Sequence, residues 1–435
     1  DGNNILPVVC GAPNVETGQK IAFAPVGAVL PGDFIISKAK IRGEISQGMI
    51  CSEKEMGISD EHDGIMVLNI NATPGEPFIN YLNNFLATLE LDITPNRPDC
   101  FSHMGIARDL AVKLNKNIKT PSYKKRLFEK NLTKEMINIS FENPDDCPRY
   151  IAGIVEDVKV GPSPDWLKLK LESIGQRSIN NVVDISNFVL LEMGQPSHIF
   201  DYDKIQSKEI LIRRGKKGEK IVTLDEQSRS LSQNELLITN GKIPIAIAGI
   251  MGGLNTVVTD KTSRVLVECA YFNAPTIRKG AKALGMSTEA SKRFERGADP
   301  NGAENAYWRI IQLLEEVANG KWIPGIVDPY PKKINQDSIG LTRKKLNILS
   351  GCEIADSMVV KSLTKLGCLV KVKNGGWACI PPSWRPDLER EVDLIEEVIR
   401  IYGYDNIPST FNYEGILNNK GTDPHISLSK MINIL

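Results

Sequence analysis

The chain has 435 residues, which suggests roughly three domains at about 150 residues each. Hydrophobic residues make up 41% and charged residues 24%, as is ordinary for a globular protein. The 53 Lys and Arg residues balance the 53 Asp and Glu residues, which is untypical of a dedicated duplex-DNA binder and leaves recognition of a nucleic acid to local patches and shape.

The first 80 residues alternate short apolar runs with turn residues such as Pro31-Gly32-Asp33. Turn residues recur here at intervals of about 8 to 12 residues, which is typical of short strands joined by turns. The pattern therefore predicts a small β-barrel over residues 1–80. Within it, Lys38, Lys40 and Arg42 stand at alternate positions, so an extended strand would present them on one face. That face is either a solvated surface or an RNA contact.

Helical spacing begins after Asp99, at Met104, Ala107, Leu110 and Leu114. A charged stretch that starts at Pro121 follows, so residues 81–135 are predicted to hold a helical segment and a linker. From 136 to 333, strands and helices mix without a regular βαβ repeat, which favours an α+β domain.

Residues 334–410 have the pattern of a further compact unit. We expect a helix after Thr342, a second around 355–366, a hairpin through Asn374-Gly375-Gly376 and a third helix over 391–402. Helices combined with a hairpin resemble a winged-helix arrangement.

The eight cysteines form no Cys-x-x-Cys pair, and the four histidines are dispersed. This distribution argues against a structural zinc site and is typical of a reducing compartment, so we expect a cytoplasmic protein. No apolar run reaches the roughly 18 to 20 residues of a membrane span, and no signal peptide is recognisable. Because the chain starts at Asp1 in the middle of a pattern, we expect a fragment of a longer protein.

Five motifs in a fixed order narrow the interpretation. They are Thr94-Pro95-Asn96-Arg97-Pro98-Asp99-Cys100, Gly194-Gln195-Pro196-Ser197-His198-Ile199-Phe200-Asp201, Arg293-Phe294-Glu295-Arg296-Gly297-Ala298-Asp299-Pro300, Pro382-Ser383-Trp384-Arg385-Pro386-Asp387 and Tyr402-Gly403-Tyr404. Three earlier stretches, 8–14, 27–32 and 41–52, resemble a tRNA-binding module of the OB type. Together they resemble the β subunits of bacterial phenylalanyl-tRNA synthetases, over residues 8 to about 408.

The resemblance implies a multidomain α+β fold. It assigns an OB-type tRNA-binding barrel to 1–80, a B3/B4-like editing domain to 136–333, a winged-helix-like B5 domain to 334–410 and the start of a truncated class II synthetase-like domain to 411–435. It also implies the function of a phenylalanine–tRNA ligase β subunit, with tRNA(Phe) and a catalytic α subunit as partners in an α₂β₂ heterotetramer. ATP would bind on the α subunit, and this chain would contribute tRNA binding and hydrolytic editing of Tyr-tRNA(Phe).

The family's editing pocket corresponds to six positions of the middle domain. The resemblance implies catalytic roles for Asn187, His198 and Glu268, and substrate-binding roles for Ser186, Gly249 and Ala290. Ser186 stands where the family commonly has Thr, so a hydroxyl is kept and a methyl is lost. A site that hydrogen-bonds the extra hydroxyl of tyrosine can reject phenylalanine strongly, and Glu268 is the candidate acceptor.

The residues alone leave structural interpretations of this pocket open. A single histidine beside a turn, such as His198, is more often a hydrogen-bonded structural residue than a catalyst. Glu268 lies within an apolar strand, where it needs a partner and would simply pair with a buried arginine.

Four carboxylates near the third helix of residues 334–410 form a candidate metal site. Asp393, Glu396 and Glu397 lie one turn apart on a helix, with Asp387 just before it. Their spacing suits Mg²⁺, which prefers oxygen ligands, but also a solvated acidic face near a helix N-terminus. The resemblance implies that these four bind Mg²⁺ at the junction with the α subunit.

Two other functions stay open. The chain could be a stand-alone hydrolase that clears mischarged tRNA in trans, or a non-catalytic tRNA-binding protein with a decayed pocket. Activity without an α subunit would favour the first, and absence of editing by an intact complex would favour the second.

Overall fold

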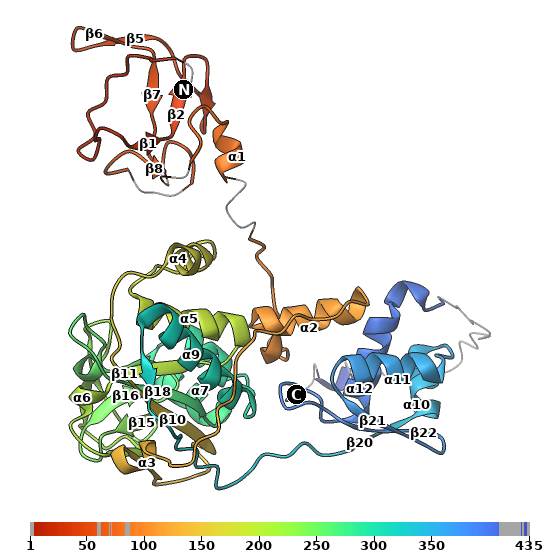
Figure 1. Ribbon diagram of the computed structural model, residues 1–435. Helices are drawn as coiled ribbons and strands as arrows, with labels where there is room; N and C mark the ends of the chain where they lie inside the picture. The colour runs from red at the N-terminus through yellow and green to blue at the C-terminus, as the bar shows by residue number, and fades with distance from the viewer. Residues whose placement is uncertain are drawn as a thin grey trace. The chain divides into compact units, whose positions relative to one another are not determined.

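A computed structural model describes residues 4–58, 62–68, 70, 72–82, 88–408, 428 and 430–432 (Figure 1). The chain forms two compact units. Unit 1 comprises Asp1–Asp92 with Ser163–Ile179, and unit 2 comprises Ile93–Pro162 with Asn180–Leu435. The start of a further domain predicted for 411–435 lies outside the described residues, apart from 428 and 430–432.

Unit 1 pairs its described strands two by two, all antiparallel. The pairs are β1 (Lys20–Ile21) with β8 (Val67–Leu68), β2 (Phe23–Pro25) with β7 (Gly48–Ile50), β3 (Val29–Leu30) with β4 (Phe34–Ile35), and β5 (Ala39–Ile41) with β6 (Glu44–Ser46). Two short helices, α1 (Phe78–Leu82) and α4 (Asp165–Glu172), belong to the same unit. These strands have only two or three residues each, and no closed barrel joins them within the described residues, so the predicted barrel is not confirmed.

The β5–β6 hairpin shows how the local sequence directs the chain here. Ile41 pairs with Glu44, which leaves Arg42 and Gly43 as a two-residue turn. Both have positive φ angles, 51° and 95°, as the favoured type I′ hairpin turn requires. We expected Lys38, Lys40 and Arg42 to share one face of a single extended strand. The turn interrupts that strand, because Lys40 lies on β5 whereas Arg42 lies in the turn.

The central part of unit 2 contains two sheets that pack face to face. One has the order β11 (Ser197–Asp201), β18 (Val265–Tyr271), β10 (Arg149–Glu156), β19 (Lys321–Trp322); the other has the order β17 (Met251–Gly252), β16 (Pro244–Ile247), β15 (Leu236–Thr239), β12 (Glu209–Arg214), β9 (Asn138–Phe141). Only the β9–β12 pair is parallel within these two sheets. A separate hairpin pairs β13 (Lys220–Val222) with β14 (Ser228–Ser230).

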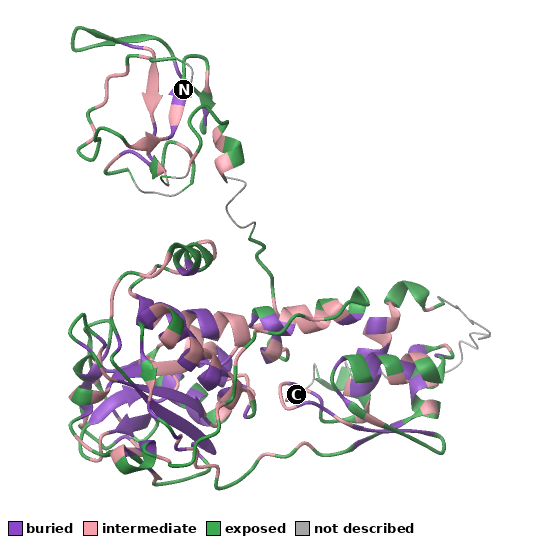
Figure 2. Ribbon diagram, viewed as in Figure 1, coloured by how far each residue is buried: buried purple, intermediate pink, exposed green. Residues whose placement is uncertain are grey.

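The core lies between these sheets. Tyr150, Ala152 and Ile154 of β10 face the same hydrophobic cluster as Ile210 and Ile212 of β12. The other face of the first sheet is covered by α9 (Gly302–Ala318), which contacts β10 and β18, while α5 (Asn181–Met193) packs against α9 and β11. Figure 2 shows the buried residues concentrated in these layers.

Shorter helices complete this part of unit 2. They are α2 (His103–Lys113), α3 (Thr133–Met136), α6 (Tyr202–Ile205), α7 (Ala274–Leu284) and α8 (Glu289–Phe294). The start and end of α5 follow from its sequence. The Asn180 side chain accepts hydrogen bonds from the backbone N–H groups of Val182 and Val183, and Gly194 ends the helix at φ 77°.

The remaining part of unit 2 confirms the helices and the hairpin expected after residue 334. The helices are α10 (Arg343–Ser350), α11 (Asp356–Lys365) and α12 (Glu391–Tyr402), and the sheet has the order β20 (Ile339–Thr342), β22 (Gly376–Ile380), β21 (Leu369–Lys373). Thr342 caps α10 through its side chain, and Asn374-Gly375 turns the hairpin with Gly375 at φ 81°. The winged-helix description of this unit is not confirmed.

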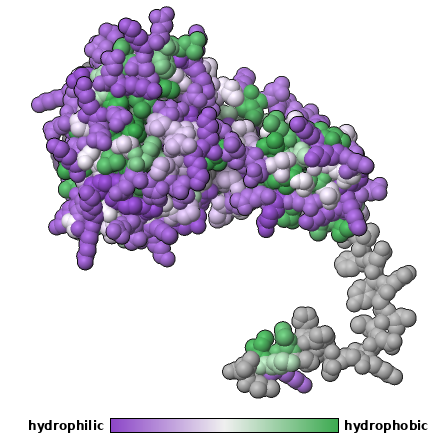
Figure 3. All heavy atoms as spheres, turned by 90° about the horizontal axis from the view of Figure 1, so that it is seen from below, coloured by the Kyte–Doolittle hydropathy of each residue, from purple (hydrophilic) through white to green (hydrophobic). Residues whose placement is uncertain are grey.

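No helix in the described part of the chain combines the length and the apolar character needed to cross a membrane. Hydrophilic side chains cover most of the face of unit 2 drawn in Figure 3, and hydrophobic side chains gather there in smaller patches.

Candidate functional site

His198 and Glu268 lie directly opposite each other on neighbouring strands. They are register partners in the antiparallel β11–β18 pair. Residues opposite each other across such a pair project from the same face, with Cβ atoms about 4.5–5.5 Å apart. Strand pairing thus brings together two predicted residues that lie far apart in the sequence.

A cavity of about 250 Å³ opens over these two side chains. The two sheets, α5 and α8 contribute to its walls. Five of the predicted residues line it: Asn187 from α5, His198 from β11, Gly249 after β16, Glu268 from β18 and Ala290 from α8. The structure therefore gathers the predicted editing-pocket residues around one cavity, with the exception of Ser186.

Ser186 lies behind the wall of the cavity. Its hydroxyl lies 3.0 Å from the Ser197 hydroxyl and donates a hydrogen bond to the Ser197 carbonyl oxygen, at 3.1 Å. Ser197, the neighbour of His198, lines the cavity in its place. Ser186 thus fastens α5 to the start of β11, beside the cavity.

Glu268 is a buried carboxyl group with no partner among the described residues. Only 4% of its surface is exposed, and no described residue donates a hydrogen bond or forms an ion pair with it. Burial raises its pKa from 4.5 to about 8. The expected pairing with a buried arginine is therefore wrong for the described residues. At neutral pH much of the group is protonated, so its hydroxyl can donate one hydrogen bond while its carbonyl oxygen accepts another.

Burial shifts the pKa of His198 in the opposite direction and likewise favours the neutral form. It lowers the pKa of the imidazole from 6.5 to about 4, so the ring is neutral at pH 7 and keeps one nitrogen free to accept a proton. The ring packs edge-on against Phe200, with centroids 4.4 Å apart. On another side lies Gly252, where an added Cβ would come within 2.4 Å of the imidazole Cε1. The close approach of this glycine fixes the position of the ring.

Several lining residues were not predicted. Thr288 caps α8 by accepting from the Ser291 backbone N–H, and its own hydroxyl donates to the Ile250 carbonyl oxygen at 2.9 Å. The sequence contains a signal for this N-terminal cap, because Thr288 carries a hydroxyl group and stands three positions before Ser291. Apolar walls come from Leu190, Leu224, Met251, Phe272 and Phe294. Nothing in their spacing distinguishes them from ordinary core residues.

The four predicted metal ligands do not converge. Asp387 and Glu397 both accept hydrogen bonds from Arg385, at 2.7–2.8 and 3.1 Å. Asp393 accepts from the backbone N–H and the guanidinium of Arg390 at the start of α12, and Glu396 is exposed.

The described residues contain no group of three or more His, Cys, Asp or Glu side chains arranged to hold a metal. Three of the four predicted ligands, Asp387, Asp393 and Glu397, bind guanidinium groups, and the four do not fit a metal ion by themselves.

The chain is similar to known protein families over most of its length. Three family models match the chain: a putative tRNA binding domain at residues 1–77, a B3/4 domain at 146–319 and a tRNA synthetase B5 domain at 339–404. The cavity lies within the second of these ranges.

Curated relatives match over almost all of the chain. It is 44% identical to the phenylalanine–tRNA ligase beta subunit of Syntrophus aciditrophicus over 413 residues, which are 94% of this chain and 51% of that protein. It is 43% identical to the same subunit of Halalkalibacterium halodurans over 424 residues, 96% of this chain and 52% of that protein. The chain thus spans about half the length of these relatives.

A solved structure also matches, an N-terminal fragment of the phenylalanyl-tRNA synthetase beta subunit from Pyrococcus horikoshii. The match has 19% sequence identity and a TM-score of 0.38, and covers 71% of this chain and 85% of that one.

Proposed function

The chain belongs to the family of phenylalanine–tRNA ligase beta subunits, and on this premise we propose that it edits mischarged tRNA. In this proposal the cavity over Glu268 and His198 hydrolyses Tyr-tRNA(Phe). Unit 1 contributes to tRNA binding, and the chain assembles with a catalytic α subunit that binds ATP and charges tRNA(Phe) within an α₂β₂ heterotetramer.

The observation that carries the proposal is the unpartnered carboxyl group of Glu268. Tyrosine exceeds phenylalanine by one hydroxyl group, which is too small a difference for an apolar pocket to detect strongly. A buried polar group that a phenol satisfies and a phenyl ring leaves unpaired discriminates far better. Glu268, which no described residue satisfies, is such a group.

The chemical step needs a water molecule and a site for its proton. Water attacks the ester carbonyl that joins tyrosine to the terminal ribose, the bond from the carbonyl carbon to the ribose oxygen breaks, and free tyrosine and tRNA leave. The neutral imidazole of His198 can accept the proton of the water and return it to the ribose oxygen. Asn187, on the adjacent wall, would orient the ribose or the water, and Gly249 and Ala290 would leave room for the ring.

For unit 1 we propose an OB-type tRNA-binding module. The match to a putative tRNA binding domain supports this assignment, and so does the β5–β6 hairpin, where Lys40 and Arg42 are exposed. For residues 334–410 we propose a winged-helix-like B5 arrangement, supported by three helices with one hairpin.

The carboxylates of Asp387, Asp393, Glu396 and Glu397 remain a proposed Mg²⁺ surface. Four oxygen-bearing side chains suit this ion in chemical type. Because Arg385 and Arg390 occupy three of them, a site here would need further oxygen ligands from the α subunit.

The test is deacylation of Tyr-tRNA(Phe) by the assembled αβ enzyme. We expect Glu268→Ala and Glu268→Gln to slow hydrolysis by roughly 10- to 100-fold, since a buried polar group that loses its hydrogen-bond partner costs about 1–3 kcal/mol. Charging of tRNA with phenylalanine should be unchanged. Asp203→Asn, which removes an exposed carboxylate of the same part of unit 2, serves as the control and should hydrolyse normally.

Three results would contradict the proposal in different ways. Equal hydrolysis by wild type and Glu268→Ala would remove Glu268 from the mechanism. No hydrolysis by the intact enzyme would indicate a non-catalytic tRNA-binding chain. Full hydrolysis by this chain without an α subunit would indicate an editing enzyme that acts alone.

A further inference from the structure

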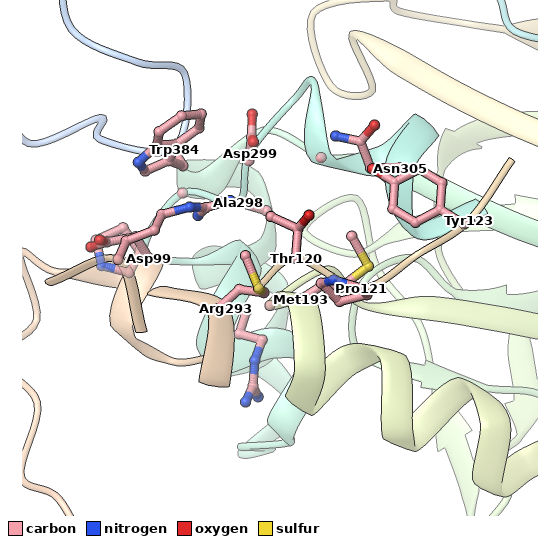
Figure 4. Close-up of a pocket in the computed structure, with 16 residues that line it drawn as sticks. Asp99, Thr120, Pro121, Tyr123, Met193, Arg293, Ala298, Asp299, Asn305 and Trp384 are labelled. Carbon is pink, nitrogen blue, oxygen red and sulfur yellow. The ribbon is translucent and has the colours of Figure 1, made fainter. Parts of the chain in front are cut away.

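A second cavity, of about 240 Å³, lies in unit 2 away from the candidate editing pocket. The two cavities share none of their lining residues. Its walls come from η1 (Pro98–Cys100), α2, the segment around Tyr123, the end of α5, the turn between α8 and α9, and Trp384. Figure 4 shows Trp384 and Asp99 at one end, Tyr123 and Asn305 at the other, and Thr120 and Pro121 between them.

Arg108 of α2 is the unusual member of this lining. Its guanidinium lies over the Trp384 ring, 4.2 Å from the centroid, and forms no hydrogen bond or ion pair with any described residue. Burial lowers its pKa, whereas carboxylate partners raise the pKa of Arg385 and Arg400 despite burial. An arginine stacked on an aromatic face keeps the N–H groups at its edge free for bidentate binding of a carboxylate or phosphate.

One uncompensated carboxylate faces the same cavity. Asp299 accepts a hydrogen bond from the Asn301 backbone N–H through one oxygen, at 2.9 Å. Of the charged groups around Arg108 it has the strongest electrostatic influence, yet the two form no ion pair. Opposite charges that line one cavity without touching leave space for a ligand that bridges them.

The other charged groups of the lining have partners elsewhere. Asp99 is paired with Arg97 at 3.0 Å. Arg293 donates to the Phe101 carbonyl oxygen and to Glu289, and in Figure 4 its guanidinium points away from the cavity. Among the described residues, the cavity therefore offers one cation, Arg108, and one anion, Asp299.

The remaining walls are largely apolar, with a few neutral polar groups. Apolar surface comes from Pro98, Met104, Pro121, Met193 and Trp384. The volume is below the range of roughly 300–1,000 Å³ typical of drug-sized ligand sites, so the ligand must be small.

We propose that this cavity binds a free α-amino acid with an apolar side chain. Its carboxylate would lie on Arg108, its ammonium group at Asp299, and its side chain against the methionines and Trp384. A phosphate ligand fits less well, because Asp299 and Asp99 would repel its charge. The proposal is independent of editing, since it uses none of the residues around Glu268.

The test is calorimetric titration of the 435-residue chain with L-phenylalanine, L-tyrosine, L-methionine and L-leucine. We expect at least one of them to bind, and Arg108→Met and Asp299→Asn each to weaken it by tenfold or more. Arg264→Met, at an exposed arginine paired with Asp203, is the matched control and should bind normally. Glu268→Gln should also bind normally, although it should edit more slowly.

Ligand analogues identify the charged groups that are recognised. For phenylalanine, 3-phenylpropanoate lacks the ammonium group and 2-phenylethylamine lacks the carboxylate, and both should bind at least tenfold more weakly. The proposal is overturned if none of the four amino acids binds, or if binding survives both Arg108→Met and Asp299→Asn. It is also overturned if inorganic phosphate binds instead in an Arg108-dependent manner, or if Glu268→Gln abolishes binding, which would place the amino acid in the editing pocket.

Discussion

Two glutamates of this chain are equally buried and have opposite electrostatics. Glu268 in the candidate pocket and Glu397 on α12 are each 4% exposed. Burial alone would raise the pKa of both. For Glu397, hydrogen bonds from Arg400 and Arg385 outweigh burial and lower the pKa to about 2, whereas Glu268 has no such partner and its pKa rises to about 8.

The opposite pKa shifts indicate that Glu397 is a structural carboxylate, whereas Glu268 is available to a ligand. Glu397 belongs to a continuous series of ion pairs: Asp387 and Glu397 bind Arg385, Glu397 and Asp109 bind Arg400, and Asp109 binds Arg97. This series joins α12 to α2. Glu268 makes no contact of this kind with any described residue, so its burial is a cost to folding that the proposed phenol ligand would offset.

We expect the largest loss of folding stability when Arg385, which binds Asp387 and Glu397, is replaced. Arg385→Met leaves Asp387 without its arginine and the buried Glu397 with Arg400 alone, and breaking a buried pair in this way costs about 3–5 kcal/mol. Urea denaturation of variant and wild type measures the change in the free energy of unfolding. Arg390→Met, at the exposed arginine that pairs with Asp393, is the control and should cost no more than about 1 kcal/mol. Equal losses of unfolding free energy in the two variants would show that the buried ion pairs of Arg385 stabilise the protein no more than the exposed Arg390 does.

The second prediction is that the stability contributed by Glu268 and by Glu397 depends on pH in different ranges. The folded pKa of Glu268 lies above its ordinary value of 4.5, so the folded protein holds the proton longer, and wild type should lose stability relative to Glu268→Gln as the pH rises from about 4.5 to about 8. The folded pKa of Glu397 lies below 4.5, so the stability that Glu397 contributes is present above that pH and is lost as the pH falls towards about 2.

Unfolding free energies at a series of pH values, for wild type and both glutamine variants, measure these slopes. Over the range between about pH 5 and 8, only the difference between wild type and Glu268→Gln should change with pH. The same slope for both variants would mean that the two carboxyl groups are compensated alike.

Much of unit 2 could be predicted because its signals are local. The spacing of apolar residues and a following glycine located α12 at the residues observed, and Asn374-Gly375 predicted the hairpin that is found. The cavity over His198 and Glu268 was expected only from the family resemblance, since no local pattern relates a residue of β11 to one of β18.

The remaining features depend on which side chains meet in space. Helical spacing suggested that the α12 carboxylates share a face free to bind a metal, but it contains no information on Arg385, which folds back from the preceding loop to bind Asp387 and Glu397. Likewise, an apolar strand could not show whether Glu268 would have an arginine partner. The barrel of residues 1–80 was inferred from turn spacing, which predicts strands but not whether their pairing closes a sheet.

The smallest predicted effect tests whether Glu268 is truly uncompensated. Tyr150 lies on the same face as Glu268, one diagonal away across the β10–β18 pair, and its fully buried hydroxyl has no hydrogen-bond partner in the described structure. Removing an unsatisfied hydroxyl should not destabilise the protein, so Tyr150→Phe should leave the melting temperature unchanged or raise it.

Tyr307→Phe provides the matched control for this substitution. Its hydroxyl is equally buried but accepts a hydrogen bond from Trp322 Nε1 at 2.9 Å, so its removal should cost about 1 kcal/mol or more. If Tyr150→Phe were as destabilising as Tyr307→Phe, the Tyr150 hydroxyl would have a partner in solution, and Glu268, one diagonal away on that face, is the candidate. Glu268 would then resemble Glu397, and the argument that its carboxyl group is reserved for a ligand would fail.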